Sequence, residues 1–236
     1  HPTADLMYST AVAGLQPDGV TLADGTHVQA NCIVDGRGPR SSMEEGQGYQ
    51  KFVGYEVELD EEHHLDGPIL MDGCVPQSDG LRFFYVLPFG PRRLLIEDTY
   101  FSDRDNLDVK AIGQEIEAYA SQKDWTIQTI VRREWGVLPL PWVTTESPST
   151  SSPIDSGYRG GYFHPVTGYS LPPALRFAHV IAQSTNEESR QRELDRLNGQ
   201  LRRQKRHFHR LNRVFFRYYE PEDRWHLMAR FYRRPE

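Results

Sequence analysis

The stretch "LRFFYVLPFGPRRLLIEDTYF", from Leu81 to Phe101, indicates the kind of fold that this chain forms. It contains two runs rich in aromatic and branched aliphatic residues, separated by Gly90 and Pro91. Such runs favour β-strands, and a Gly-Pro pair between them favours a turn. We therefore expect the two runs to pair as an antiparallel β-hairpin.

The second run ends in two adjacent carboxylates, Glu97 and Asp98. Because side chains alternate between the two faces of a strand, these carboxylates are expected to point in opposite directions. One interpretation is a solvated strand end, where both acids pair with Arg92 or Arg93. The other is a carboxyl in an apolar cavity, where desolvation raises the pKa and keeps the group protonated as a general acid. The pattern alone leaves both open.

The segments around this hairpin predict a β-rich first part and a helical C-terminal part. Strands are expected at "KFVGYEVEL", "GPILMDG" and "TIQTIVRREWGVLPLP", and Asp-Gly pairs at 18–19 and 24–25 are typical of hairpin turns. An amphipathic helix is predicted over 107–122, and helices are expected after a Ser/Thr/Pro-rich loop at 144–157. A sheet layer joined to helices is an α/β or α+β architecture. The sequence contains no GxGxxG fingerprint.

The composition limits the class of protein. Hydrophobic residues make up 38% of 236 residues, and the mean hydropathy is -0.64. No run approaches the roughly 20 apolar residues of a spanning helix, which excludes a polytopic membrane protein, and the first residues do not resemble a signal peptide. Cys32 and Cys74 are too few for a metal framework, so we expect reduced core thiols and no metal site. The net charge of -6 argues against a general nucleic-acid binder.

Two glycine-containing stretches are candidates for binding a phosphate-bearing ligand. In "VDGRGPR", a strand is expected to end at Asp35, and Gly36 and Gly38 flank Arg37. Glycine lets a backbone come close to a ligand, and arginine can face a phosphate. An ordinary tight turn with a surface arginine explains the same pattern.

The second stretch, "GYRGGYFHPVTGYSLPPALRFAHVIA", leads from Gly157 through His164 into a helix that is expected to begin near Pro173. Proline suits a first helical turn, and the N–H groups of a helix start can bind phosphate. The alternatives are a structural loop with a capping serine and a packed histidine. The combination of small residues, proline and a helix start favours a cofactor loop.

The segment 202–217, "RRQKRHFHRLNRVFFR", carries seven arginine or lysine residues and no acid. Apolar residues are interleaved with these charges at helical spacing, which is typical of an interfacial helix on anionic lipid. RNA binding is a competing interpretation. A helix packed on its own domain is another.

Taken together, "VDGRGP", "GYQKFVGYEVEL", "GPILMDGCVPQSDGLRFFYVLP", "LLIEDTYFSD", "GVLPLP" and "GYFHPVTGYSLP" resemble the bacterial flavoprotein lycopene β-cyclases. The resemblance covers nearly the whole chain, and blocks 48–103 and 157–173 are its most specific parts. It implies that the ends of linear lycopene are closed to β-ionone rings, giving β-carotene without net redox change. It also implies reduced FAD as cofactor, NAD(P)H as electron source, and a cytoplasmic protein peripherally bound to the anionic inner membrane through the 202–217 helix.

The same resemblance implies roles for individual acids. Glu97, in the I-E-D-T block, is expected to protonate the terminal double bond of lycopene or to stabilise the resulting cation. Asp98 and Asp72 are lesser candidates, for a base or for structural support. Four aromatic residues are candidates for lining the polyene tunnel or shielding the cation, with core packing as the alternative: Phe83, Phe84, Tyr85 and Trp135.

The FAD-binding regions of the family match two groups of residues, which are Asp35, Gly36, Arg37 and Gly38, and then Gly161, His164, Pro165, Thr167 and Gly168. Family members begin with a Rossmann segment that this sequence lacks, so we expect an incomplete FAD/NAD(P)-binding Rossmann-like fold with an antiparallel substrate sheet. The expected domains are a remainder of the FAD-binding domain at 1–47, a substrate sheet with one helix at 48–156, an FAD loop and helix at 157–186, and a basic amphipathic helical tail at 187–236.

Two other functions remain open from the sequence. One is an FAD-dependent monooxygenase or oxidoreductase on a related scaffold, which would consume NAD(P)H in proportion to an oxygenated product. The other is a truncated, non-catalytic peripheral membrane module that binds carotenoid.

Overall fold

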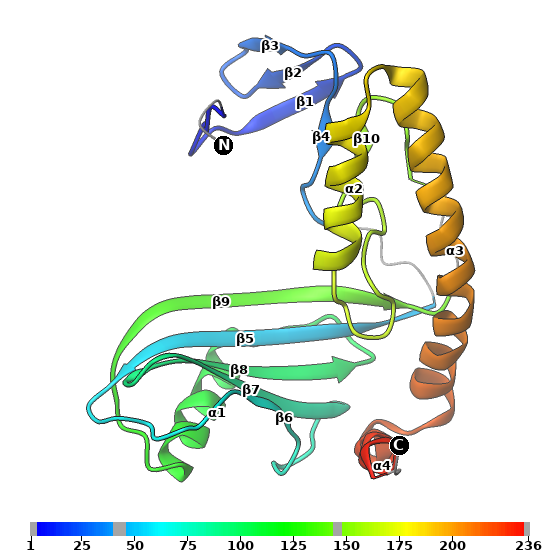
Figure 1. Cartoon of the computed structure of the whole chain (residues 1–236). Coiled ribbons are helices and arrows are strands. Elements are labelled where there is room, and N and C mark those ends of the chain that lie inside the picture. The colour runs from blue at the N-terminus through cyan, green and yellow to red at the C-terminus, as the bar shows by residue number, and fades with distance from the viewer. Residues whose placement is uncertain (1–3, 40–45, 144–147, 234–236) are drawn as a thin grey trace. The chain divides into compact units, whose positions relative to one another are not determined.

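The computed structural model describes residues 4–39, 46–143 and 148–233 of the chain, and Figure 1 labels their elements. The chain forms two compact units. One consists of residues 1–43 and 144–207, and the other of residues 44–143 and 208–236. The domain boundaries predicted at 47, 156 and 186 stay a prediction, because compactness in space does not identify a function.

The first unit contains two small sheets. Three antiparallel strands form the larger one, β1 (Val12–Gln16), β2 (Gly19–Leu22) and β3 (His27–Gln29), and the Asp-Gly pairs mark its turns as predicted. The other is a parallel pair of β4 (Val34–Asp35) and β10 (Ile154–Asp155). The Ser/Thr/Pro-rich segment predicted as a loop therefore contains a short strand, because its backbone pairs with the strand that precedes the "DGRG" turn.

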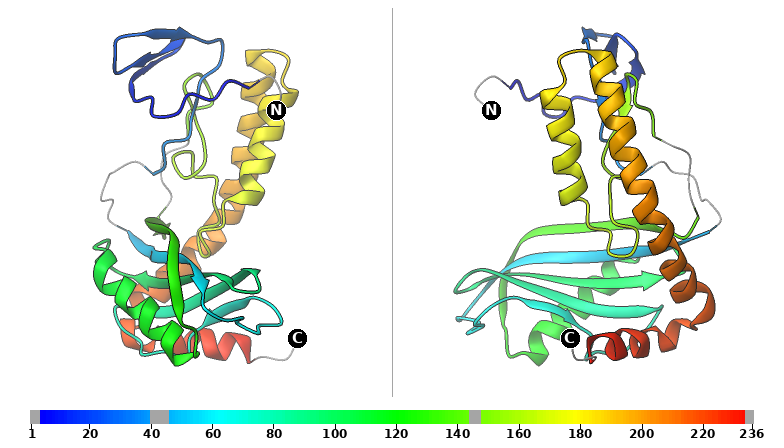
Figure 2. Two further views of the ribbon diagram at one scale, coloured as in Figure 1. Left: turned by 90° about the vertical axis from the view of Figure 1, so that its left-hand side faces the viewer. Right: turned by 45° about the vertical axis from the view of Figure 1, so that its right-hand side comes forward.

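Two helices complete the first unit, α2 (Leu171–Gln183) and the first part of α3 (Glu187–Tyr218). Figure 2 shows them side by side in both views. Their apolar residues form a core with β10 and the loop before α2, and its buried members are Ile154, Tyr162, Phe177, Leu194, Leu197 and Leu201. This core fixes the loop that the sequence predicts for cofactor binding.

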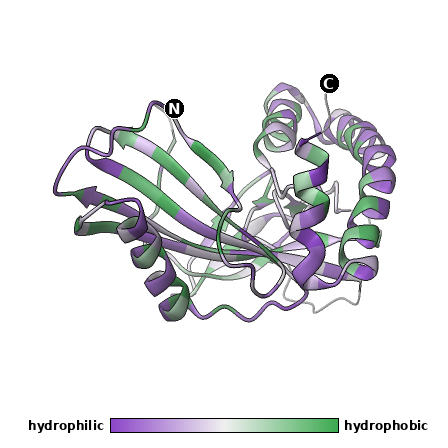
Figure 3. Cartoon of the chain, turned by 90° about the horizontal axis from the view of Figure 1, so that it is seen from below, coloured by the Kyte–Doolittle hydropathy of each residue, from purple (hydrophilic) through white to green (hydrophobic). Residues whose placement is uncertain are grey.

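The second unit is built on a five-stranded antiparallel sheet with the order β6-β7-β8-β5-β9. Its strands are β5 (Gln47–Leu59), β6 (Ile69–Asp72), β7 (Leu81–Gly90), β8 (Arg93–Ser102) and β9 (Ile127–Pro141). The predicted hairpin is confirmed, because β7 pairs with β8 from Leu81 opposite Phe101 to Gly90 opposite Arg93. Runs of apolar residues, interrupted by polar ones, follow these strands, as Figure 3 shows.

Helices lie on both faces of this sheet. The helix α1 (Val109–Gln122), predicted at 107–122, packs Ile112 and Ile116 against one face. The end of α3, the short helix η1 (Pro221–Asp223) and α4 (Arg224–Tyr232) belong to the same unit. Phe216 and Met228 from these helices pack with an apolar cluster on the other face, formed by Leu81, Phe83, Phe101 and Leu140. The mixed α/β class with a helical C-terminal part is confirmed.

A buried arginine fastens α4. The Arg224 side chain is 1% exposed, and its Nη2 donates to both carboxylate oxygens of Asp103, at 2.7 and 2.8 Å. The two cysteines are free. Cys32 is half-buried and packs against the core of the first unit, whereas Cys74 is exposed, so the expectation of a core thiol was wrong for Cys74. Within the described residues, no helix has the length and apolar character needed to cross a membrane.

Candidate functional site

Glu97 lies in the middle of β8, between strands β7 and β5. The strand register places Tyr85 opposite it on one side and Gly54 on the other, and Gly54 in turn pairs with Glu134 of β9. Residues paired in this way share one face of the sheet. The site is therefore a row across four strands: Tyr85, Glu97, Gly54 and Glu134.

Asp98 lies on the opposite face, as the alternation predicts. It is 0% exposed and accepts from Arg82, from Nη2 at 2.8 Å and from Nε at 3.0 and 3.2 Å. The Tyr100 hydroxyl donates to the same carboxylate at 2.9 Å, and Glu115 of α1 binds the same guanidinium at 2.9 Å. These contacts place Asp98 in a buried ion pair beneath α1, a position of structural support rather than of access to a ligand.

The arginines next to the hairpin turn do not pair with either acid. Arg93 donates to Glu56 at 2.8 Å, and Arg92 lies 3.8 Å from Glu58. With Asp98 fully buried and Glu97 half-buried, the solvated strand end is excluded.

The surroundings of Glu97 favour the neutral carboxylic acid. Burial raises the pKa of Glu97 to about 6, because desolvation penalises the charged form. The Thr99 hydroxyl, which donates to Oε1 at 2.8 Å, opposes this change, whereas the negative charges of Glu134 and Asp98 add to it. A carboxyl with this property can hold a proton near neutral pH and deliver it to a weak base.

This raised pKa has a measurable consequence for stability. In the unfolded chain Glu97 has its ordinary pKa of 4.5, so the folded state binds the proton more tightly. The favourable contribution is complete below pH 4.5 and is lost as the pH rises through 6. We expect the difference in unfolding free energy between the natural protein and Glu97→Gln to fall by about 2 kcal/mol from pH 4 to pH 7. Urea unfolding at a series of pH values measures it, and a pH-independent difference would contradict the assignment.

Asp72 lies on the α1 face, where it accepts from the Tyr119 hydroxyl at 2.7 Å, from the backbone N–H of Cys74 at 3.0 Å and from Lys123 at 3.3 Å. Burial acts to raise its pKa, but these hydrogen bonds outweigh burial and hold the pKa below its ordinary value. Asp72 is therefore ionised and engaged in holding α1. It does not share a face with Glu97.

The four predicted aromatic residues divide between the two faces. Tyr85 and Phe83 are on the Glu97 face, with ring centroids 5.1 Å apart. Phe84 is buried on the α1 face and stacks on Tyr119 at 4.0 Å. Trp135 is on that face too, and it is 57% exposed. Period-two alternation turns Phe84 and Trp135 away from Glu97, and for Phe84 the contacts agree with the alternative of core packing.

Sequence reasoning missed two neighbours of Glu97, Gly54 and Glu134. A Cβ added at Gly54 would lie 3.1 Å from Cγ of Glu134 and 3.4 Å from its Oε1, so the Glu134 side chain occupies the space above Gly54. The glycine inside the strand "KFVGYEVEL" could have indicated this contact, because a glycine within a strand often marks a place where another group comes close to the backbone. The residue that lies across from Gly54, Glu134, depends on how β5 and β9 are aligned, and no local sequence pattern contains that information.

The first predicted cofactor segment forms a turn after β4. Asp35 is buried and accepts from Arg37 Nε at 2.9 Å and Nη2 at 2.8 Å, and Arg159 lies 3.2 Å away. The Arg37 side chain is therefore bound to its own strand. Gly38 has φ +87°, and no atom of the described residues lies within 4 Å of a Cβ added there, so among them its backbone is open to an approaching group.

The second predicted segment is a loop held by its own hydrogen bonds. The Tyr158 hydroxyl donates to the Gly168 carbonyl, the Gly168 N–H donates to the His164 carbonyl at 2.9 Å, and the ring of His164 lies 3.2 Å from Thr167 Oγ1. Burial lowers the pKa of His164, and Pro165 is buried beside it. Gly161 has φ +68°, and Lys205 of α3 donates to its carbonyl at 2.5 Å.

The two segments meet in the first unit. The Ser156 N–H donates to the Asp35 carbonyl at 2.9 Å, and Gly36 faces the Ser156 hydroxyl. The helix start after the loop is a poorer anion site than the sequence suggests, because Pro172 and Pro173 have no N–H. Ser170 is the N-cap residue but makes no side-chain capping bond.

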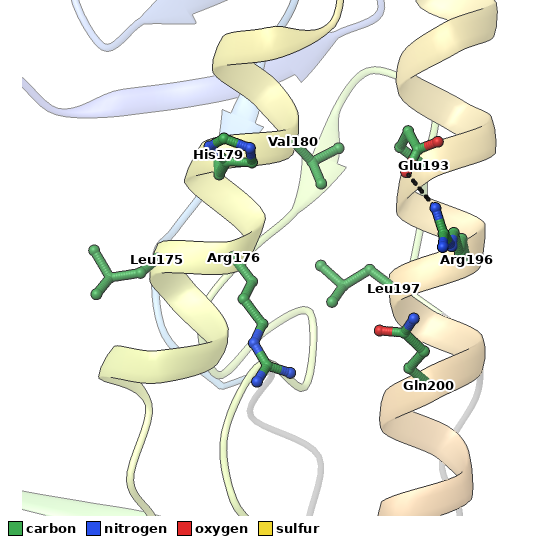
Figure 4. A pocket seen from close by; sticks show the side chains of 8 residues that line it. All are labelled: Leu175, Arg176, His179, Val180, Glu193, Arg196, Leu197 and Gln200. Atoms are coloured by element: carbon green, nitrogen blue, oxygen red, sulfur yellow. Dashed lines mark ion pairs between the residues drawn. The ribbon is translucent and has the colours of Figure 1, made fainter.

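Two surface grooves lie away from these residues. One runs between α2 and α3, lined by Leu175, Val180 and Leu197 with the ion pair Arg196–Glu193 at its edge (Figure 4). The other lies between the end of α1 and the start of β9. Neither contains a predicted site residue. Among the described residues, no three His, Cys, Asp or Glu side chains are grouped to hold a metal ion.

Comparison with known proteins identifies the relatives of the chain. The family described as "Lycopene cyclase protein" matches residues 7–236. The lycopene beta-cyclase of Paracoccus sp. (strain N81106 / MBIC 01143) is 40% identical over 98% of this chain, and that of Pantoea ananas is 37% identical over the same share. In each case the chain spans 62% of the relative's length.

Among solved structures, the fold is similar to that of Xcc4156, a flavin-dependent halogenase from Xanthomonas campestris. The TM-score is 0.52 at 14% identity, and the match covers 93% of this chain and 48% of the halogenase chain. At this identity the likeness concerns the fold alone, and it agrees with the α/β class expected from the sequence.

Proposed function

The chain belongs to the lycopene cyclase family, and from this membership we propose that the protein closes the ends of linear lycopene into β-ionone rings, giving β-carotene. The observation that carries the proposal is Glu97. It is a half-buried carboxyl in the middle of the sheet, and its pKa of about 6 keeps a proton available near neutral pH. The substrate class is taken from the relatives.

Cyclisation makes a definite demand on such a carboxyl. An alkene is a very weak base, so only a neutral acid shielded from water can protonate it. The Glu97 proton moves to a carbon of the terminal double bond, and the resulting cation is attacked by a neighbouring double bond, which closes the ring. Loss of a ring proton to a base then restores neutrality. One proton enters and one leaves, so the product is an isomer of the substrate.

Thr99 has an orienting role in this scheme. Its hydroxyl donates to Glu97 Oε1 at 2.8 Å, which leaves Oε2 to carry the proton that is transferred. Tyr85 and Phe83 lie on the same face, where their ring faces can stabilise positive charge on the substrate. Asp98 and Asp72 hold the opposite face together and take no part in proton transfer.

FAD is the cofactor that we propose. The residues that would hold it are the turn Asp35, Gly36, Arg37 and Gly38, and the loop residues Gly161, His164, Pro165, Thr167 and Gly168. The open backbone at Gly38 fits a phosphate-bearing ligand, and the similarity in fold to a flavin-dependent halogenase supports a flavin. When bound in its reduced form, with NAD(P)H as the electron source, a flavin would supply negative charge that stabilises the cation.

We also propose that the protein lies peripherally on the cytoplasmic side of the inner membrane, because its C40 substrate dissolves in lipid. The last turns of α3 support it, because three apolar side chains stay exposed there at helical spacing: Leu211, Val214 and Tyr218. Exposed arginines stand beside them, which suits an anionic lipid surface. Not every apolar residue of the 202–217 segment is available for contact with lipid, because Phe216 is buried against the sheet.

The experiment that tests the function uses the protein at its full natural length, with reduced FAD and lycopene in anionic vesicles. We expect a product with the retention time and absorption spectrum of β-carotene, and no stoichiometric consumption of NAD(P)H. Oxidation of NAD(P)H in step with an oxygenated product would instead indicate a flavin monooxygenase or oxidoreductase. Binding to the vesicles with no product would indicate a carotenoid-binding module without catalysis.

A further inference from the structure

A second carboxylate, Glu134, stands across Gly54 from Glu97. Gly54 pairs with Glu97 on one side and with Glu134 on the other, and its missing side chain leaves the space between them open. The Glu134 side chain fills that space, because Cγ and Oε1 would lie 3.1 and 3.4 Å from a Cβ placed on Gly54. A side chain at position 54 would therefore press on Glu134 and make it shift.

Arg132 fixes the position of Glu134. Its Nη1 donates to Oε2 of Glu134 at 2.5 Å, and its Nε donates to Glu56 at 3.0 Å. Glu56 also accepts from Arg93 at 2.8 Å. The result is a row of alternating charges, Arg93, Glu56, Arg132 and Glu134. Glu134, the negative residue at one end of this row, lies above Gly54, and Gly54 pairs directly with Glu97.

Several charged and polar residues share the sheet face of Glu97. They include Thr99 and Arg93 on β8, Tyr85 on β7, Glu56 and Glu58 on β5, and Arg132 and Glu134 on β9, while Asp98 lies behind the sheet. Both arginines are bound to carboxylates of the row, and Thr99 is neutral. Burial is the largest cause of the raised pKa of Glu97, and the negative charge of Glu134 is the next largest cause that acts in the same direction.

We propose that Glu134 is a positioning residue: its carboxylate above Gly54 disfavours the ionised form of the Glu97 carboxyl and so raises the fraction of Glu97 that can serve as the proton donor. The inference rests on the proposed function, because it takes Glu97 to be the acid of the reaction. Only the neutral form of a carboxyl can protonate an alkene, so the fraction of Glu97 that holds a proton limits the rate at neutral pH. A fixed negative neighbour raises that fraction.

The proposal is tested by titrating the Glu97 carboxyl directly. Carbon-13 NMR of glutamate carboxyls follows its protonation, and the signal is assigned by its loss in Glu97→Gln. We expect Glu134→Gln to lower the titration midpoint of Glu97 by about half a pH unit, because one nearby like charge is removed. In the cyclisation assay, the pH at which activity falls to half should decrease by the same amount.

Two further variants make the test specific. Gly54→Ala changes no charge but places a methyl group 3.1 Å from Cγ of Glu134, so it should displace that side chain and shift the midpoint in the same direction. Glu117→Gln removes an exposed carboxylate from α1, on the opposite face, and should leave the midpoint unchanged.

The outcomes separate this inference from the function it rests on. An unchanged midpoint in Glu134→Gln, or an equal shift in Glu117→Gln, would overturn the role of Glu134 whether or not β-carotene is formed. A shifted midpoint supports the role of Glu134, even in a protein that yields no cyclic product. Absence of that product from the natural protein overturns the proposed function alone.

Discussion

Replacing Glu97 by glutamine should slow the formation of β-carotene by a factor of about 10² to 10⁴, the usual contribution of a general acid. Glutamine keeps the shape of the side chain and can still accept from Thr99, but it has no acidic proton to give to an alkene. The initial rate of β-carotene formation measures the effect. Flavin binding should be unchanged, because the predicted flavin residues lie in the first unit and Glu97 lies in the second.

The matched control for this prediction is Glu58→Gln, at the far end of β5. Glu58 is paired at 3.8 Å with an exposed arginine, so its removal should change the rate by less than about twofold. Near-normal turnover by Glu97→Gln would end the assignment of Glu97 as the acid. Equal losses in both variants would instead indicate a general sensitivity of the sheet.

Replacing Asp98 by asparagine should lower the unfolding free energy by about 3–5 kcal/mol, which makes it the largest expected effect on stability. Asp98 is 0% exposed and is the main partner of Arg82, whose side chain is 4% exposed. The substitution removes the buried counter-charge of the guanidinium and leaves it only the half-exposed carboxylate of Glu115, and the Tyr100 hydroxyl loses a carboxylate acceptor. Chemical denaturation of the two proteins at pH 7 gives the difference.

Glu115 provides the control for this second prediction. It binds the same guanidinium at 2.9 Å, but its side chain is 54% exposed, so Glu115→Gln should cost no more than about 1 kcal/mol. A double replacement, Arg82→Met with Asp98→Leu, should recover much of the loss, because it leaves no unpaired charge in the core. A small effect of Asp98→Asn on the unfolding free energy would contradict the prediction and would show that water replaces Asp98 as the partner of Arg82.

Local sequence patterns predicted most of the elements of the second unit. The runs on either side of Gly90-Pro91 could pair only as a hairpin, and the helical spacing of Ile112, Ile116 and Tyr119 located α1 within two residues. Alternation was enough to send Glu97 and Asp98 to opposite faces. These properties are local, because they follow from backbone geometry and from residues close in sequence.

Predictions that depend on distant partners were less successful. The sequence grouped Phe84 and Trp135 with Phe83 and Tyr85 as aromatic candidates, but only the strand register shows that Phe84 and Trp135 lie on the face opposite Glu97. For the 202–217 segment the sequence left a lipid-surface helix, an RNA-binding helix and a helix packed on its own domain open, and only the contacts of Lys205 with Gly161 and of Phe216 with the sheet show that it packs on the protein. In each case the partner that decides the environment lies far away in the sequence.

The sequence by itself determined the antiparallel sheet, the helix that covers one of its faces, and the separation of the acidic pair. The tertiary structure alone decided what each acid does, because burial and charge come from other strands. Arg82 makes Asp98 part of the core, while Gly54 opens the space in which Glu134 approaches Glu97. A carboxyl's proton affinity depends on desolvation and on charges within a few ångströms, and these are set by strand register rather than by local sequence.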